Sequence, residues 1–528
     1  MLDPSEQIAA AYDAHTAGRH DVAEAGYRAV LANHPTQVDA LFLLSSLLSE
    51  PQPEAALDLA RSALNASRGG GGLGVSEVAL LDHGAACLRR LELDPQAEVD
   101  LLTRAMALDP ANSTRLFLLG EAQRRSGRGG DAIVMFRRFL ERQPDDVNAL
   151  SNVGALLLQA DRNLDALTVL ERVVALAPRH MHGWINLATI YSRLNRLDEA
   201  EDAYRRALDL EPSNQAAKQG LNNVYTRVVP RWHFVMMNDR RRNEAYQAAI
   251  ERAISRFRET NGRPPLVLEI GAGSGLLSMM AARAGAEHVV ACEMVRPVAE
   301  VATGIVARNG LADRVTVHNK KSSDLVVGID LPRRADILVS EIFDAGLLGE
   351  NVLAALSHAR EHLLRPDATI VPARATVRMM PIESPEIHEY YNASNANACG
   401  FDFEPFNLFA KVGYDQLALR RYAFDALADP VAVLDFDFTT DVPDRERLIS
   451  VVPKRDGSLH AWTFWFTLDF DGETFFDTGP YTASTCWAQA VQIEQQPRRV
   501  RPGEPVSVRV SQTRSEIRFA FDDGPTSN

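Results

Sequence analysis

Apolar and polar positions in the N-terminal half of the chain repeat with a period of 34 residues. Pro110, Pro144, Pro178 and Pro212 lie at this spacing, and each ends a similar phrase: MALDP, LERQP, VALAP or LDLEP. Before each proline, apolar side chains recur at helical spacing in two successive stretches. One helix pair cannot bury its apolar face alone, so neighbouring pairs must stack on one another. The pattern therefore predicts an all-α solenoid.

The period and the residue types are those of tetratricopeptide repeats. In the clearest repeat, Trp184 marks the first helix, and Ala200 and Tyr204 mark the second. Small alanines let antiparallel helices approach, and aromatic side chains fill the space between them. We expect about five or six repeats and a capping helix over residues 4–229. Because such arrays present an extended surface to partners, we expect this domain to recruit a protein substrate.

After Pro230 the pattern changes to strands that alternate with helices, which predicts an α/β domain over residues 230–370. An apolar strand, Leu266–Ile270, leads into a glycine-rich turn and then a helix. The turn contains Gly271, Gly273 and Gly275. A second apolar strand ends at Glu293, where a carboxylate can accept hydrogen bonds from both hydroxyls of a ribose. Together these features predict a nucleoside cofactor.

The glycine spacing favours S-adenosylmethionine over NAD. The turn reads GxGxG followed by LLS, whereas a pyrophosphate is normally bound by GxGxxG at a helix N-terminus. A sulfonium cofactor has no pyrophosphate to bind. The alternative is that the glycines serve only as a structural turn.

The stretch ILVSEIFDAGLLGE places Glu341 and Glu350 at the two ends of a short loop after a third apolar strand. Two convergent carboxylates repel each other unless a cation lies between them. A guanidinium group fits because it is planar, always charged and donates in a fork. The two carboxylates would hold the cation and leave electron density on the nitrogen that faces a methyl donor, with no need for a metal. Alternatively, each glutamate is a helix-capping or solvated loop residue.

Together these motifs resemble the protein arginine N-methyltransferases over roughly residues 230–500. The matching phrases are RWHFVMMNDRRRNEAY, VLEIGAGSGLLS, ACEM and SEIFDAGLLGE. The resemblance implies a multidomain protein, in which a Rossmann-like methyltransferase domain is followed by a β-barrel over residues 371–528. The repeat array is similar to the repeat-bearing branch of the family, whose members carry two methyltransferase modules, whereas this chain has length for one.

The resemblance also assigns roles to single residues. Arg242 matches the arginine that pairs with the cofactor carboxylate, and Met236 matches a side chain that lines the acceptor pocket. Ser322 or Ser323 lies where the family contacts adenine, although a surface loop is the alternative for both. Asp344, within the glutamate loop, resembles the branch that makes monomethyl or symmetric dimethyl products, and we assign it to the substrate site.

The phrase STCWAQAV matches a family loop that usually reads Thr-His-Trp. Cys486 stands where the histidine is common, so the contacts of that histidine cannot be transferred. Trp487 is either a substrate-binding residue or a buried core indole. An aromatic-rich insertion over about residues 386–415 falls where the family has a dimerisation arm, which implies a homodimer. Its aromatic residues could equally be local core.

Composition narrows the function further. A chain of 528 residues has length for several domains, and its net charge of −14 argues against sequence-independent nucleic-acid binding. The four cysteines show neither a CxxC pair nor metal-ligand spacing. The N-terminus lacks an export signal, and no run of about 18 apolar residues follows. We therefore expect a cytoplasmic protein without a metal, nucleic-acid or membrane partner.

The function predicted from the sequence is S-adenosylmethionine-dependent methylation of arginine in a partner protein. Two alternatives stay open. The first is a methyltransferase for a small guanidine or amine, against which the repeat array argues because a small substrate needs no solenoid. The second is a repeat scaffold whose cofactor module is inactive, for which Cys486 is the favourable feature.

Overall fold

The computed structural model describes residues 3–68, 74–393, 399–483 and 485–522. The chain divides into two compact units, residues 1–225 and 226–528. The sequence placed this boundary between residues 229 and 230, a few residues further along. Each unit has its own hydrophobic clusters.

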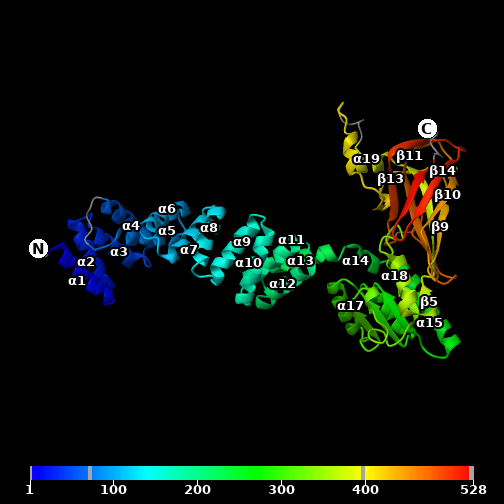
Figure 1. The fold of residues 1–528 in the computed structure, drawn as a ribbon, viewed down its shortest axis with the longest axis horizontal. Helices are drawn as coiled ribbons and strands as arrows, with labels where there is room; N and C mark the ends of the chain where they lie inside the picture. Colours follow the sequence, from blue (N-terminus) through cyan, green and yellow to red (C-terminus); the bar gives the residue numbers. More distant parts are fainter. Residues whose placement is uncertain (1–2, 69–73, 394–398, 484, 523–528) are drawn as a thin grey trace. The chain divides into compact units, whose positions relative to one another are not determined.

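The first unit is a series of antiparallel helix pairs, which follow one another in chain order in Figure 1. The helices are α1 (Pro4–Thr16), α2 (His20–Asn33), α3 (Val38–Leu48), α4 (Pro53–Ser67), α5 (Glu77–Arg90), α6 (Pro95–Leu108), α7 (Ser113–Arg125), α8 (Gly129–Leu140), α9 (Val147–Gln159), α10 (Asn163–Leu176), α11 (Met181–Arg193), α12 (Leu197–Leu210) and α13 (Gln215–Val228). The predicted tetratricopeptide array is confirmed.

Small residues on one helix of a pair face large side chains on the other. A Cβ at Gly120 would lie 3.0 Å from the ring of Phe136, and one at Gly154 would lie 2.6 Å from Leu170. These pairs are one repeat apart. The repeated placing of a glycine against a large side chain therefore sets how closely α7 approaches α8 and α9 approaches α10.

The second unit begins with a parallel sheet in the order β3-β2-β1-β4-β5. Its strands are β1 (Leu266–Ile270), β2 (His288–Cys292), β3 (Val315–His318), β4 (Ala335–Ser340) and β5 (Leu364–Val371). The accompanying helices are α14 (Trp232–Met237), α15 (Arg240–Asn261), α16 (Leu276–Ala284), α17 (Arg296–Arg308), α18 (Val352–His358), the 3-10 helix η1 (Ser322–Asp324) and the π-helix η2 (Ala359–Leu363). Every residue of β1 is buried, as expected for a central strand covered on both faces.

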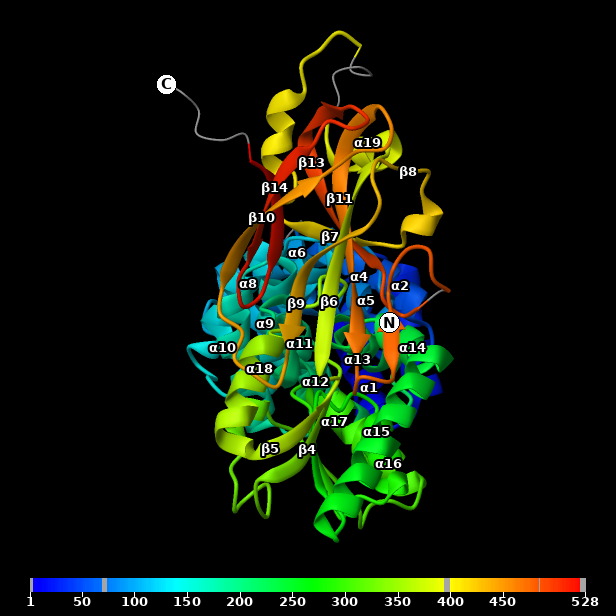
Figure 2. The same ribbon diagram turned by 90° about the vertical axis from the view of Figure 1, so that its right-hand side faces the viewer.

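Antiparallel strands make up most of the rest of the second unit, and Figure 2 shows the long strands β6, β11 and β13 among them. The strands are β6 (Arg374–Glu383), β7 (Tyr414–Leu417), β8 (Asp425–Ala426), β9 (Val431–Asp437), β10 (Arg445–Val451), β11 (Gly457–Asp469), β12 (Phe475–Asp477), β13 (Gln489–Val500), β14 (Val506–Gln512) and β15 (Ile517–Phe521). The order β7-β13-β11-β6-β8 forms one sheet, with β9 on β6, and β10-β14-β15 forms another.

The predicted order of an all-α array, a parallel α/β domain and an antiparallel β domain is confirmed. Hydrogen bonds among the described strands do not close the β domain into a continuous barrel. Both sheets nevertheless cover one core, in which Phe464 of β11 meets Phe519 of β15 at 5.1 Å between ring centroids.

The insertion predicted as an arm over about residues 386–415 coincides with α19 (Pro385–Tyr391) and the 3-10 helix η4 (Glu404–Phe409). The 3-10 helix η5 (Leu419–Arg421) follows it, after β7. Large apolar side chains of η4 are strongly exposed, with Leu408 at 85% and Phe409 at 75%. The interpretation of these aromatic residues as local core is therefore wrong for η4. Residues 394–398 of the predicted arm lie outside the described part of the chain.

Among the described residues, no helix combines the length and apolar character needed to cross a membrane.

Candidate active site

Three loops meet at the carboxyl edge of the parallel sheet. Ile270, the last residue of β1, pairs in register with Cys292 of β2 and with Ser340 of β4. The residues that come next in the chain are Gly271, Glu293 and Glu341. The sheet register therefore brings the predicted cofactor turn, ribose carboxylate and first loop glutamate to one edge.

The turn after β1 has a left-handed backbone, with φ of 80° at Gly271, 51° at Gly273 and 76° at Gly275. Residues with a side chain rarely adopt these angles. A Cβ at Gly271 would also lie 2.5 Å from Cγ2 of Ile342. The Gly273 N–H donates to Oε2 of Glu293 at 3.0 Å. The glycine turn is thus fixed against the end of β2.

Glu293 is 8% exposed, and its carboxylate accepts hydrogen bonds from the backbone. Besides Gly273, the Val295 N–H donates to Oε1 at 2.9 Å. A carboxylate oxygen can accept two hydrogen bonds, so both oxygens retain a lone pair for a ribose hydroxyl. The geometry fits the predicted role.

Ser322 and Ser323 lie in η1, in the loop that follows β3. Asn319 of the same loop donates to the Glu293 carbonyl at 2.9 Å, which links this loop to the ribose side of the site. The Ser323 hydroxyl donates to Asp324 at 3.1 Å. No hydrogen bond among the described residues joins either serine to Glu293, and their contact with adenine stays a prediction.

A small cavity lies between α14, α15, the glycine turn and the end of β4. Its lining contains Met236, Met237, Arg242, Glu269, Gly271, Ala272, Ser274, Leu276, Leu277 and Glu341. Met236, predicted for the acceptor pocket, therefore contributes to the cavity beside the glycine turn.

Arg242 forms an ion pair with Glu341 inside this cavity. Its Nη2 donates to Oε2 of Glu341 at 2.5 Å, and both side chains are 4% exposed. Nη1 donates to Asn243 at 2.8 Å, whereas the buried Nε has no hydrogen-bond partner among the described residues. A buried donor without an acceptor is costly. This orphaned N–H suits a ligand that brings an acceptor such as a carboxylate.

Glu269 is a site residue that our sequence interpretation missed. It lies in β1, is buried, and accepts a hydrogen bond from the Ser278 hydroxyl. Burial raises the pKa of the Glu269 carboxyl to about 8, despite the opposing effect of Ser278. The sequence contains a signal for this residue: the apolar strand LVLEI includes a glutamate, and core packing does not account for a charged side chain there.

The glutamate loop runs from Glu341 to Glu350 and is closed by Asp344. Oδ1 of Asp344 accepts from the Gly349 N–H at 2.9 Å, and Oδ2 accepts from the Tyr414 hydroxyl. Asp344 therefore shapes the loop. Its predicted contact with substrate stays a prediction.

The two loop glutamates influence each other electrostatically. Burial raises the pKa of the Glu341 carboxyl, and the charge of Arg242 opposes this rise. Glu350 belongs to the exposed residues, yet desolvation and the negative charges of Glu341, Asp344 and Glu293 raise the pKa of its carboxyl to about 7. Several carboxylates therefore lie near one another at this end of the sheet, and the ion pair described there is the one between Arg242 and Glu341. A bound cation would relieve the repulsion between the carboxylates.

The loop containing Cys486 and Trp487 contacts two segments of the site, the start of α15 and the glutamate loop. Asp239 caps α15 through the Arg242 N–H, and its Oδ2 accepts from the Cys486 N–H at 2.7 Å. The Trp487 indole N–H donates to the Phe343 carbonyl at 2.7 Å. Trp487 is buried, in agreement with its interpretation as a core indole, and it fixes the glutamate loop; a contact with substrate stays a prediction.

Comparisons with known families match separate parts of the chain. Residues 373–524 match the arginine methyltransferase oligomerization subdomain, and residues 250–371 match ribosomal protein L11 methyltransferase. Tetratricopeptide repeat families match residues 117–178 and 183–214.

Comparison with the sequences of known proteins identifies the family. An arginine N(omega)-methyltransferase of Streptomyces achromogenes subsp. streptozoticus is 35% identical over 296 residues, which cover 56% of this chain and 80% of the relative. The chain belongs to the protein arginine methyltransferase family. Human protein arginine N-methyltransferase 9 is 31% identical over 332 residues, and the match spans only 38% of that relative's length.

Among solved structures, one that the chain matches is the Trypanosoma brucei PRMT1 enzyme–prozyme heterotetrameric complex with AdoHcy. It is 24% identical with a TM-score of 0.49 and covers 57% of this chain and 96% of that chain.

Proposed function

We propose that this family member transfers a methyl group from S-adenosylmethionine to a guanidinium nitrogen of arginine in a partner protein. The observation that carries the proposal is the pair of carboxylates, Glu341 and Glu350, at the carboxyl edge of the sheet beside the cofactor cavity. Family membership supports the same reaction.

The residues of the cavity, together with Glu293 bonded to the adjacent glycine turn, fit S-adenosylmethionine, which when bound supplies an electrophilic methyl group on a positively charged sulfur. Glu293 would hold the ribose hydroxyls, and the Arg242 guanidinium, with its orphaned Nε–H, would hold the carboxylate. A Cβ at Gly273 would meet only Cε of Met236, at 4.0 Å, so a ligand can approach the backbone at this position of the turn. The surrounding carboxylates favour a cationic ligand.

The acceptor guanidinium would lie between Glu341 and Glu350. Oε2 of Glu341 is used by Arg242, and Oε1 accepts no hydrogen bond from the described residues. The Glu350 carboxylate likewise has no hydrogen bond or ion pair within the described chain. Both groups are thus available to orient the guanidinium and to draw its positive charge away from the attacking nitrogen.

Methyl transfer would form a carbon–nitrogen bond at the acceptor while the sulfur–methyl bond breaks and its electron pair stays on sulfur. The acceptor would be left with one surplus proton. A group with a pKa near the working pH is suited to accept it. Glu350, whose carboxyl pKa is about 7, meets this requirement at neutral pH. We assign this proton to Glu350.

The decisive experiment measures labelled methyl transfer from S-adenosylmethionine to an arginine-rich peptide, to its lysine-substituted twin and to free arginine. We expect label on the arginine peptide, and mass spectrometry should show monomethyl or symmetric dimethyl arginine, the products that Asp344 led us to predict. Free arginine is included because the name of the Streptomyces relative specifies arginine alone. Label on free arginine only, or on neither peptide despite cofactor binding, would overturn the proposal.

Cofactor binding should weaken when a side chain is added to the glycine turn. In Gly271→Ala, the new Cβ would meet Ile342 at 2.5 Å in a backbone with φ of 80°. We expect affinity for S-adenosylmethionine, measured by calorimetry, to fall at least about 10-fold, since strain and displacement of this size cost about 1–3 kcal/mol. Gly310→Ala is the matched control, because Gly310 has φ of 69° but nothing within 4 Å. Equal affinities in the two variants would contradict the role of the turn.

We also propose a homodimer formed through the arm. The exposed apolar side chains of η4 and the match to an oligomerization subdomain support self-association. Leu408→Asp should shift the mass measured by light scattering toward the monomer. Leu164→Asp, at a residue that is 70% exposed in the repeat array, should not. A monomeric wild-type protein would exclude the dimer.

Recruitment of the substrate by the repeat array is a further proposal, supported by its architecture. A whole substrate protein should then have a lower KM than a peptide cut from around its target arginine, with a similar kcat. Equal KM values would argue against recruitment.

The cytoplasmic location proposed from the sequence can be checked by cell fractionation.

A further inference from the structure

Tyr414 contacts the glutamate loop, although nothing in its sequence context marks it. It is the first residue of β7, which pairs with β13 in the β domain. Its hydroxyl donates to Oδ2 of Asp344, in the middle of the loop. Burial and the adjacent Asp344 charge raise the pKa of Tyr414, so the hydroxyl stays protonated and able to donate at neutral pH.

The loop sequence is adapted to the Tyr414 ring. A Cβ at Gly346 would lie 2.3 Å from Cζ of Tyr414, and one at Gly349 would lie 2.5 Å from Asp344 and 3.0 Å from the Tyr414 hydroxyl. Neither glycine is among those with positive φ. They are therefore small in order to let the ring and the aspartate approach.

The hydrogen bonds form a chain that leads to Glu350. Tyr414 holds one oxygen of Asp344, and the other oxygen holds the N–H of Gly349, the residue directly before Glu350. The Leu347 backbone within the loop has φ of 76°, an unfavourable value for a residue with a side chain. A strained loop needs external contacts to keep its shape, and Tyr414 supplies one.

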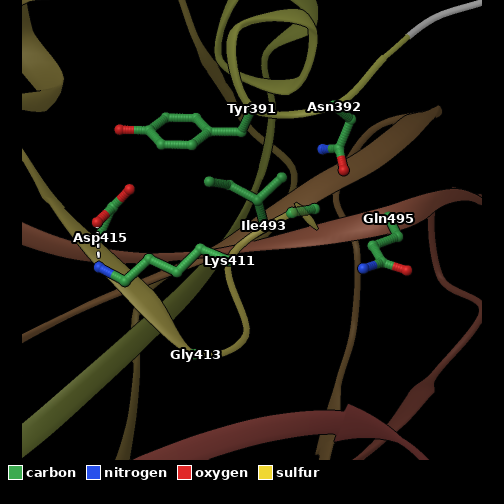
Figure 3. A pocket seen from close by; sticks show the side chains of 8 residues that line it. Tyr391, Asn392, Lys411, Gly413, Asp415, Ile493 and Gln495 are labelled. Carbon is green, nitrogen blue, oxygen red and sulfur yellow. Dashed lines mark hydrogen bonds and ion pairs between the residues drawn. The ribbon is translucent and has the colours of Figure 1, made fainter. Parts of the chain in front are cut away.

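Tyr414 itself is held rigidly. Its ring packs edge-to-face on Phe464 of β11, with 5.2 Å between centroids. On the other side, the chain reaches Tyr414 from the arm through Gly413, whose φ is 101°. The residues around this junction line a small pocket with Tyr391 and Asn392 of the α19 segment, and Lys411 pairs with Asp415 there (Figure 3).

We propose that Tyr414 is a positioning residue that fixes Glu350 through Asp344 and Gly349. It thereby ties the geometry of the acceptor site to the strand that leaves the arm. The inference rests on the proposed methyltransferase function, because it concerns where Glu350 is held during that reaction.

Tyr414→Phe keeps the ring over Gly346 and removes only the hydroxyl. We expect kcat with the arginine peptide to fall about 10-fold, because hydrogen bonds to charged groups contribute free energies of this order. The KM for S-adenosylmethionine should not change, since Tyr414 does not line the cofactor cavity. A change in KM with constant kcat, or no change in either, would overturn the proposal.

A double-mutant cycle tests whether Tyr414 acts through Asp344. Asp344→Asn alone should also lower kcat, and the double variant Tyr414→Phe/Asp344→Asn should be no slower than the slower single variant. Multiplicative losses would show independent effects and would exclude the proposed route.

Tyr391→Phe is the matched control. Tyr391 is also a tyrosine beside an aspartate at the base of the arm, where burial and Asp415 raise its pKa, but it has no contact with the glutamate loop among the described residues. Its kcat should equal that of the wild type. Melting temperature and mass by light scattering should be the same for all variants, so that neither unfolding nor loss of the dimer accounts for the result.

If the wild type itself does not methylate the peptide, the proposed function fails; if the wild type is active and only the variants depart from the expected rates, this inference alone fails.

Discussion

Glu341→Gln should bind S-adenosylmethionine and lose most of its methyl transfer, with kcat lower by about 100- to 1,000-fold, the usual effect of removing one group that stabilises transition-state charge. Glutamine has nearly the same shape, and its amide oxygen can still accept the hydrogen bond from Arg242. What it lacks is the negative charge that, in the proposed mechanism, draws on the acceptor guanidinium. Single-turnover transfer to the arginine peptide, alongside calorimetry of cofactor binding, measures both quantities.

A control is needed because Glu341 also neutralises a buried arginine. Removing one partner of a buried ion pair leaves the other charge uncompensated and lowers the free energy of unfolding. Asp336→Asn is the matched variant. Asp336 lies near the start of β4, the strand that leads into Glu341, so it is at the opposite end of the strand from the site. Its side chain is fully buried and pairs with Arg263 at 2.7 Å. We expect Asp336→Asn to reduce the melting temperature while its folded fraction keeps the wild-type kcat. Full activity in Glu341→Gln would refute the carboxylate mechanism.

The rate of methyl transfer should fall as the pH falls through about 7, because the carboxyl pKa of Glu350 is raised to about 7. The sign follows from the charge. Above this pKa Glu350 is ionised and can hold the guanidinium and accept its proton, and below it Glu350 is neutral and can do neither. The neighbouring charges that raise this pKa are Glu341, Asp344 and Glu293. A plot of kcat against pH between 5.5 and 8.5 measures this fall in rate, the acidic limb of the profile.

Glu350→Gln identifies the group responsible for that limb. We expect kcat at pH 8 to fall about 100-fold or more, as for other groups that stabilise transition-state charge, and the remaining rate to be nearly independent of pH around 7. Tyr391→Phe, remote from the loop, should keep the wild-type profile. An unchanged acidic limb in Glu350→Gln would assign the titration to another group, with Glu269 the next candidate because its carboxyl pKa is about 8.

Several parts of the site could be predicted because neighbouring residues encode them. The turn at Gly271, Gly273 and Gly275 requires backbone angles that only glycine adopts readily, so its sequence is specific. Glu293 and Glu341 each follow an apolar strand directly, and parallel strands bring their carboxyl ends together whatever the rest of the fold does.

Other contacts could not be predicted, because they join segments far apart in the sequence. The motif around Arg242 predicts a contact with the cofactor alone, whereas the guanidinium also pairs with Glu341. Asp344 was assigned to the substrate, yet both of its oxygens are occupied within the protein. Tyr414 was not recognised at all. A short polar side chain in a loop has many possible partners, and only the packing of the β domain against the parallel sheet selects one.

The sequence by itself determined the repeat array, the parallel cofactor domain and the position of the paired glutamates at the two ends of one loop. These depend on periodicity and on short motifs, whose physical requirements are met by residues close to one another in the sequence. Only the tertiary structure decided which charges are paired, which carboxyl pKa values are raised and what holds Glu350 in place. Those properties depend on burial and on distances between residues such as Asp344 and Tyr414, and no local pattern contains them.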